Sequence, residues 1–145
     1  MNEMMNTNNE SNEKESSLDS NEIVVKVADK SAYEPYKGII DALLDKHAES
    51  VEFFDVRDIS GFADAFIIAT ARSEPNARTL REAAMDALDV MGVPYKVEGE
   101  KSVRWCLVDA GHVIVHIFNR DGKNFYSLEK LWGNAPMICF ENEDI

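Results

Sequence analysis

The chain has 145 residues, enough for one compact domain, and this length argues against a multi-domain protein. It carries 27 acidic and 15 basic residues, a formal net charge of -12, which argues against a non-specific nucleic-acid binder that neutralises phosphates with a basic surface. No apolar run approaches the roughly 20 residues of a membrane-spanning helix, and the N-terminus lacks the composition of a signal or transit peptide, so we expect a cytoplasmic protein without membrane contacts.

The N-terminal stretch is the most polar part of the chain. Its first 21 residues are rich in Asn, Glu, Ser and Met and contain no aromatic residue, so they cannot bury enough apolar surface to offset the entropy of ordering them. The segment at 22–28 is apolar but fits a strand, a helical turn or an adhesive patch equally well. We therefore predict a disordered acidic tail over 1–32 and a single domain over 33–145.

A helix followed by two strands is predicted next. Apolar side chains recur at helical spacing from Pro35 to about His47, and proline suits the first turn of a helix. Residues 51–56 and 66–71 are short runs of branched, aromatic and small apolar residues, and the second has the unbroken apolarity of a strand covered on both faces. The residues between these two strands have loop chemistry, with Phe62 to Asp64 forming a turn into the second strand.

A second helix is delimited by residues that favour its two ends. Ser73 can cap its start, with Pro75 in the first turn, and Gly92 can end it in a left-handed conformation. Its predicted buried face comprises Ala77, Leu80, Ala84, Ala87, Leu88 and Met91.

A third strand over 94–98 precedes a hairpin over 105–118, which holds two strand-like runs about a glycine. With a two-residue loop at 110–111, Trp105 pairs with His116. One face of this hairpin is wholly apolar and should be core: Cys106, Val108, Val113, Val115 and Ile117. The other face mixes apolar and polar side chains: Trp105, Leu107, Asp109, His112, Ile114 and His116. After a polar turn over 119–124, the pattern fits a short strand at 125–126 and a brief helix at 127–132.

Enzymatic chemistry finds little support in the motifs. The candidate metal ligands do not match any known ligand spacing; they are His112, His116, Asp109 and Cys106. A nucleophilic triad is not indicated, because no serine or cysteine lies on a strained turn. The glycines are scattered singly, so no phosphate-binding loop is predicted. The two cysteines have no CxxC spacing and lie in apolar surroundings, which predicts reduced core thiols rather than a disulfide or a zinc site. A divergent metal-dependent nucleotidyltransferase that uses Asp64 stays open as an alternative, although Phe66 occupies the place of its partner acid. We expect no catalytic residue, no metal and no cofactor.

The mixed face of the hairpin has two interpretations. It is either an ordinary cross-strand pairing of an aromatic residue with a histidine, partly covered by the last helix, or a binding patch for a basic partner. Tryptophan and tyrosine supply anchor energy at interfaces, and acids complement basic surfaces.

Several motifs in register resemble the ribosomal silencing factor family, also called the Iojap-like or RsfS family. They are Phe-Phe-Asp-Val at 53–56, Phe-Ile-Ile-Ala-Thr at 66–70, Val-Glu-Gly-Glu at 97–100, Arg-Trp at 104–105, Val-Ile-Val-His-Ile-Phe at 113–118 and Tyr-Ser-Leu-Glu-Lys-Leu-Trp at 126–132. The resemblance spans roughly residues 33–140. It implies an α/β fold with a mixed sheet flanked by helices, related to nucleotidyltransferases but without their catalytic acids.

The resemblance also implies a task without catalysis or cofactor. Family members bind the large ribosomal subunit through ribosomal protein L-fourteen, block its joining with the small subunit, and so repress translation when nutrients are scarce. Carried over to this chain, the partner-binding residues would be Trp105, Leu107, Asp109, His116, Tyr126 and Glu129. Direct nucleic-acid readout is not expected, and a homodimer of the free protein that shares the hairpin surface stays open.

Overall fold

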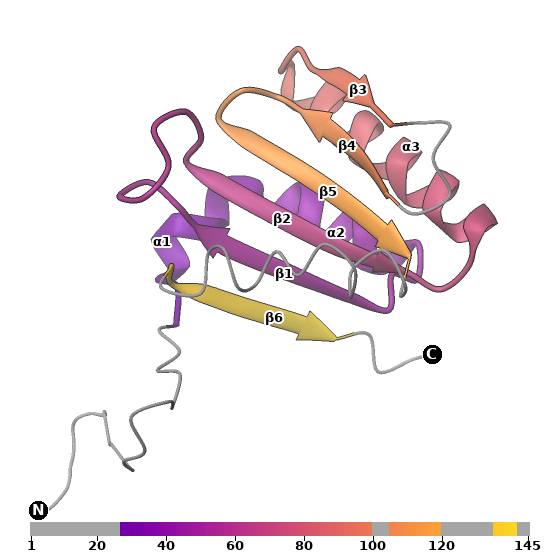
Figure 1. Ribbon diagram of the computed structural model, residues 1–145, viewed down its shortest axis with the longest axis horizontal. Coiled ribbons are helices and arrows are strands. Elements are labelled where there is room, and N and C mark those ends of the chain that lie inside the picture. Colours follow the sequence, from indigo (N-terminus) through magenta and orange to yellow (C-terminus); the bar gives the residue numbers. More distant parts are fainter. Residues whose placement is uncertain (1–26, 100–104, 120–134, 142–145) are drawn as a thin grey trace, which may run out of the picture.

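The computed structural model describes residues 27–99, 105–119 and 135–141, and it contains one mixed sheet with helices on one side (Figure 1). The helical elements are α1 (Lys30–Tyr33), the 3-10 turn η1 (Glu34–Tyr36), α2 (Lys37–Asp45) and α3 (Glu74–Met91). The strands are β1 (Ser50–Asp55), β2 (Ala65–Ala71), β3 (Lys96–Glu98), β4 (Trp105–Asp109), β5 (Val113–Asn119) and β6 (Met137–Glu141). The predicted α/β class with a mixed sheet is confirmed.

The six strands follow the order β3-β4-β5-β2-β1-β6. β2 and β5 are parallel, and the other neighbouring strands are antiparallel. The parallel pair requires a long crossover, because a strand that runs in the same direction as its neighbour must first return across the sheet. α3 supplies most of that return between β2 and the β3–β4 hairpin.

A large apolar core lies between one sheet face and the helices. From α2 it takes Ile39, Ile40 and Leu43, and from α3 it takes Leu80, Ala84 and Leu88. The hairpin contributes the whole predicted apolar face: Cys106, Val108, Val113, Val115 and Ile117. We call this side of the sheet the helix face, and the opposite side the second face.

The N-terminal helix differs from the expectation of one continuous helix over 35–47. Pro35 sits in η1, between α1 and α2, and the regular α-helix begins only at Lys37. Proline provides no N–H for a helical hydrogen bond, so it tolerates the first turn of a segment but not its interior. The chain also packs on the core before the expected domain boundary at residue 33, because Ala28 and Ala32 are buried members of the main cluster.

The α3 helix has the ends that its sequence predicts. The Ser73 hydroxyl accepts a hydrogen bond from the backbone N–H of Asn76 at 3.1 Å, and Gly92 follows the last turn with a φ of 74°. Met91 was expected in the core but is 40% exposed, since the helix has already turned its last residues outward there. The predicted strand and helix at 125–132 lie outside the described residues.

Candidate functional site

The second face brings the predicted hairpin residues together. Trp105, Leu107 and Asp109 alternate along β4 with core residues, and His116 on β5 lies directly opposite Leu107. The register continues across the whole sheet in one row: Glu98, Leu107, His116, Ile68, Glu52 and Cys139. Side chains of one row share a face because each strand contributes every second residue to it.

A smaller apolar cluster underlies this second face. Its buried members are Phe54, Val56, Ala63, Phe66, Ile68, Ile114, Phe118 and Ala135. Trp105, Leu107 and Met137 pack against it and are only partly buried. Trp105 and Leu107 thus each pack one part of the side chain on the apolar cluster and leave another part exposed, as residues at protein interfaces often do.

The hairpin register corrects the expected pairing of Trp105 with His116. The backbone N–H of Ala110 donates to the carbonyl of Val113 at 3.0 Å, so the loop is Gly111-His112 and Trp105 faces Phe118 instead. Gly111 has a φ of 85°, the conformation that glycine adopts without steric cost, and this fixes the loop one residue later than expected. Moving the loop by one residue shifts each cross-strand partner by two residues. Because side chains alternate with a period of two, the strand residues assigned to each face remain on that face.

Asp109 and Gly99 shape the site through local contacts. The carboxylate of Asp109 accepts a hydrogen bond from the backbone N–H of Gly111 at 2.8 Å, so it helps to close the hairpin turn while remaining half-buried. Gly99 has a φ of 75°, and a Cβ built there would lie 3.1 Å from Cζ3 of Trp105. The indole ring therefore rests against the glycine backbone at the end of β3.

His116 is the most perturbed titratable group of the second face. Burial lowers its pKa from the ordinary 6.5 to about 4, and the negative charge of Asp109 opposes this shift more weakly. Its ring stacks parallel to Phe118 at 6.1 Å between centroids and meets the edge of Phe66 at 5.3 Å. The Nε2 atom is buried and has no hydrogen-bond partner among the described residues. His116 is therefore a neutral, aromatic-lined imidazole near neutral pH.

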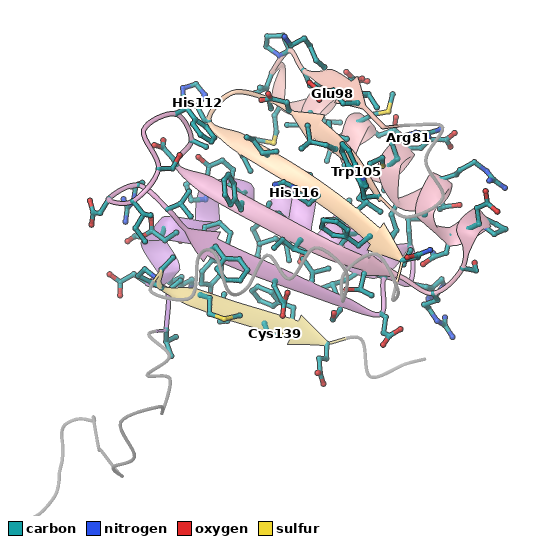
Figure 2. All side chains as sticks on the ribbon, viewed as in Figure 1. Arg81, Glu98, Trp105, His112, His116 and Cys139 are labelled. Atoms are coloured by element: carbon teal, nitrogen blue, oxygen red, sulfur yellow. The ribbon has the colours of Figure 1, made fainter. Side chains whose placement is uncertain are left out.

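The figure shows how these groups are distributed. Figure 2 shows Trp105 on β4 and His116 on β5, with Glu98 at the β3 edge and His112 at the hairpin turn. Tyr126 and Glu129, the two other predicted partner-binding residues, lie outside the described residues. Cys106 is buried as expected, whereas Cys139 is exposed on edge strand β6, which corrects the expectation of two core thiols.

Asp64, the acid on which the nucleotidyltransferase alternative depends, precedes the first residue of β2, whereas Trp105 lies near the level of the last residues of that strand. Asp64 is exposed just before β2, and its backbone N–H donates to the carbonyl of His112 at 2.7 Å. Nearby Asp55 is engaged by Arg57, with Nη2 to Oδ2 at 2.7 Å, and this hydrogen bonding lowers the pKa of Asp55. Within residues 27–99, 105–119 and 135–141, no group of three or more His, Cys, Asp or Glu side chains could hold a metal ion.

Phe62 and Gly99 are features that residue patterns did not single out. Phe62 is 69% exposed in the β1–β2 loop and its ring lies 6.3 Å from that of Phe66, at the margin of the second face. An aromatic residue within a run of loop residues was the available signal. The contact between Gly99 and Trp105 had no signal beyond the glycine itself, because five residues of the chain lie between Gly99 and Trp105. No helix of the described ranges is long and apolar enough to cross a bilayer.

Comparison with known proteins places these residues in a protein family. The model of a family described as "Ribosomal silencing factor during starvation" matches residues 29–145. The ribosomal silencing factor of Bacillus subtilis is 40% identical over 94 residues, which cover 64% of this chain and 80% of the relative. That of Halalkalibacterium halodurans is 37% identical over 103 residues, covering 70% and 88%. A crystal structure of a protein from Chromobacterium violaceum superposes with a TM-score of 0.67 at 31% identity, covering 70% of this chain and 86% of that one.

Proposed function

The chain belongs to the ribosomal silencing factor family, and we propose that it binds the large ribosomal subunit through ribosomal protein L-fourteen. Bound there, it blocks association with the small subunit and represses translation under nutrient limitation. The mechanism is occupancy, so it requires a surface of the right shape and charge but no catalytic residue and no cofactor. We place this activity in the cytoplasm.

The observation that supports this proposal most directly is the mixed composition of the second face. Trp105 and Leu107 stand partly exposed over an apolar cluster, while Asp109 borders them with a carboxylate. Interfaces combine such apolar anchors with charges at the rim, and tryptophan is among the residues that most often dominate binding energy. A patch built only for folding would be covered by apolar side chains.

Charge complementarity supports the same partner class. The chain has a net charge of -12, and acidic proteins are steered toward basic surfaces. In this proposal Trp105 is an aromatic anchor and Asp109 pairs with a basic group of the partner. On the strength of the family motif alone, we assign Tyr126 to the same aromatic anchor as Trp105, and Glu129 to the same acidic rim as Asp109.

The cross-strand partner of His116 differs from the one expected from the sequence. Phe118, not His116, stands opposite Trp105, so His116 acts beside Leu107. Its buried Nε2 has no partner among the described residues, and a buried polar atom without a partner costs about 1–3 kcal/mol. We propose that His116 contributes to the interface through its place beside Leu107, where its ring packs against Phe66 and Phe118, and not through this inaccessible atom.

Co-sedimentation with isolated ribosomal subunits tests the proposal. Wild type should sediment with the large subunit alone and should inhibit joining of the two subunits in a light-scattering assay. Trp105→Ala should weaken binding by about 2 kcal/mol, or about 30-fold in Kd, with little change in thermal stability. Val90→Ala is the control, because Val90 is 88% exposed on α3, remote from the second face.

Two outcomes contradict the proposal. If wild type sediments with neither subunit, the family's role does not extend to this chain. If Trp105→Ala is unfolded, Trp105 belongs to the core and not to an interface. A molar mass measured over a concentration series separates a third case, in which a homodimer covers the hairpin surface and must dissociate before the ribosome binds.

A further inference from the structure

The loop between β1 and β2, residues 56–64, presents large apolar side chains to solvent. Phe62 is 69% exposed and Ile59 is 45% exposed. Among the described residues, Phe62 is the only aromatic side chain with so large an exposed fraction. Exposed aromatic residues are costly to leave in water, and in binding proteins they mark contact points.

Hydrogen bonds hold this loop in one conformation. The Ser60 hydroxyl accepts from the backbone N–H groups of Phe62 and Ala63, both at 3.1 Å. The backbone N–H of Ser60 donates to the carbonyl of Val56 at 2.8 Å, and Ala63 is buried. The ring of Phe62 is thus presented by an already ordered backbone, so binding through it requires little further ordering entropy.

A line of ring contacts connects Phe62 to the proposed binding patch. The ring of Phe62 lies 6.3 Å from that of Phe66, and Phe66 lies 5.3 Å from His116. His116 in turn stacks on Phe118, which is paired with Trp105 across the hairpin. The loop is also joined to the hairpin directly, since the N–H of Asp64 donates to the carbonyl of His112. A packed row of side chains therefore links Phe62 to Trp105.

The charges around Phe62 are acidic. Asp58 and Asp64 are exposed on the same loop. The one cation of this loop, Arg57, is bound by Asp55 through two contacts, Nε to Oδ1 at 2.9 Å and Nη2 to Oδ2 at 2.7 Å. The opposite charges of Arg57 and Asp55 cancel, so the carboxylates of Asp58 and Asp64 make the electrostatic potential around Phe62 negative. A partner that buries Phe62 must present an apolar pocket with lysine or arginine at its rim.

We propose that Phe62 is a second anchor of the interface, which enters an apolar pocket with a basic rim on the same ribosomal protein that contacts Trp105. This inference rests on the proposed function and extends its contact area to the β1–β2 loop. Two anchors at opposite ends of one aromatic line fix the orientation of the bound protein, which a single anchor would leave free to rotate.

Binding titrations with purified large subunits test this proposal. Phe62→Ala should raise the Kd by about tenfold or more, and Ile59→Ala should raise it less because less of that side chain is exposed. Val90→Ala changes an apolar residue elsewhere that is even more exposed than Phe62, and it should leave the Kd within about twofold of wild type. Replacing both Asp58 and Asp64 by Asn should slow association and weaken its dependence on salt.

The outcomes separate this inference from the proposed function. If wild type does not bind the large subunit, the proposed function fails. If wild type binds, Trp105→Ala loses affinity and Phe62→Ala does not, only the second anchor fails. A clear fall in the Tm of Phe62→Ala would assign the ring to folding and overturn the inference. It would also be overturned if Phe62→Ala dissociated a dimer but kept full affinity for the subunit, because Phe62 would then serve a second copy of the chain.

Discussion

The two faces of the sheet use the same strands for different purposes. Along β5, the helix face carries Val113, Val115 and Ile117, all aliphatic and nearly inaccessible. The second face of the same strand carries Ile114, His116 and Phe118, where aromatic and polar groups replace the aliphatic ones. The helix face is matched to α2 and α3, whereas the second face holds a smaller cluster in which the buried Ile114 and Phe118 flank a histidine.

The two faces of the sheet also differ in their buried polar atoms. Nε2 of His116 and Oγ1 of Thr70 are buried without a hydrogen-bond partner in the part of the chain that the structure describes, and both residues point to the second face. Each such atom costs about 1–3 kcal/mol relative to a paired one. No polar side chain is buried on the helix face within the same residues. Stability thus dominates one face, and recognition is the reason we propose for the polar groups of the other.

Truncation on the helix face should give the largest effect. Phe53 is fully buried, and its ring contacts those of Tyr33 at 6.0 Å and Tyr36 at 6.1 Å. Phe53→Ala leaves a cavity between β1 and the N-terminal helices, so the free energy of unfolding should fall by about 3–5 kcal/mol. Urea denaturation measures this change.

The matching substitution on the second face is Trp105→Ala, which we expect to cost binding more than stability. Both variants should be unfolded in the same urea series. Equal losses of stability would mean that Trp105 is as much a core residue as Phe53, and the contrast between the two faces would then disappear.

Acid should destabilise the protein through His116. Its folded pKa of about 4 lies below the ordinary 6.5, so between these values the unfolded chain takes up a proton that the folded chain does not. The stability contributed by this group is complete above pH 6.5 and is lost as the pH falls toward 4. The loss should reach about 2 kcal/mol at pH 5, and it should be absent from His116→Gln.

Unfolding free energies at pH 8, 6 and 5 measure this effect. His112→Gln is the matched control, because it makes the same substitution at a histidine that is exposed at the hairpin turn. A wild-type profile that is flat between pH 7 and 5 would show that His116 is accessible to water in the folded state. The polar group of the second face would then carry no desolvation cost.

The sequence predicted the helix face better than the second face, and the reason is physical. Periodicity reports which residues must be hidden from water, so the apolar side of the hairpin and the caps of α3 followed directly from Val108, Ser73 and Gly92. The same alternation also assigned Trp105 and Asp109 to the opposite face. Pairing across the hairpin depended on the backbone conformation of Gly111, which residue type alone does not fix between neighbouring loop registers.

Other features of the second face arise from contacts between distant segments. β6 was not predicted, because a strand of five residues that follows Pro136 has a weak pattern until it pairs with β1. The exposure of Phe62 depends on the Ser60 hydrogen bonds that shape its loop. Recognition of the family motifs supplied the proposed task, which periodicity could not have supplied.

The smallest expected effect on stability has the most specific consequence for the second face. Gly99 and Gly92 have nearly the same left-handed backbone, with φ values of 75° and 74°. An added Cβ at either position strains that backbone by roughly 1 kcal/mol, but only at Gly99 does it approach another residue, at 3.1 Å from Trp105. Gly99→Ala should therefore lose somewhat more stability than Gly92→Ala, because its Cβ also lies 3.1 Å from the backbone carbonyl oxygen of Trp105, and only Gly99→Ala should move the indole ring and weaken binding to the large subunit. If the two variants bind equally well, the exact position of the Trp105 ring does not affect binding, and the interface tolerates a displaced anchor. If Gly99→Ala alone loses affinity while both variants stay folded, the position of the ring, and not merely its presence, determines recognition.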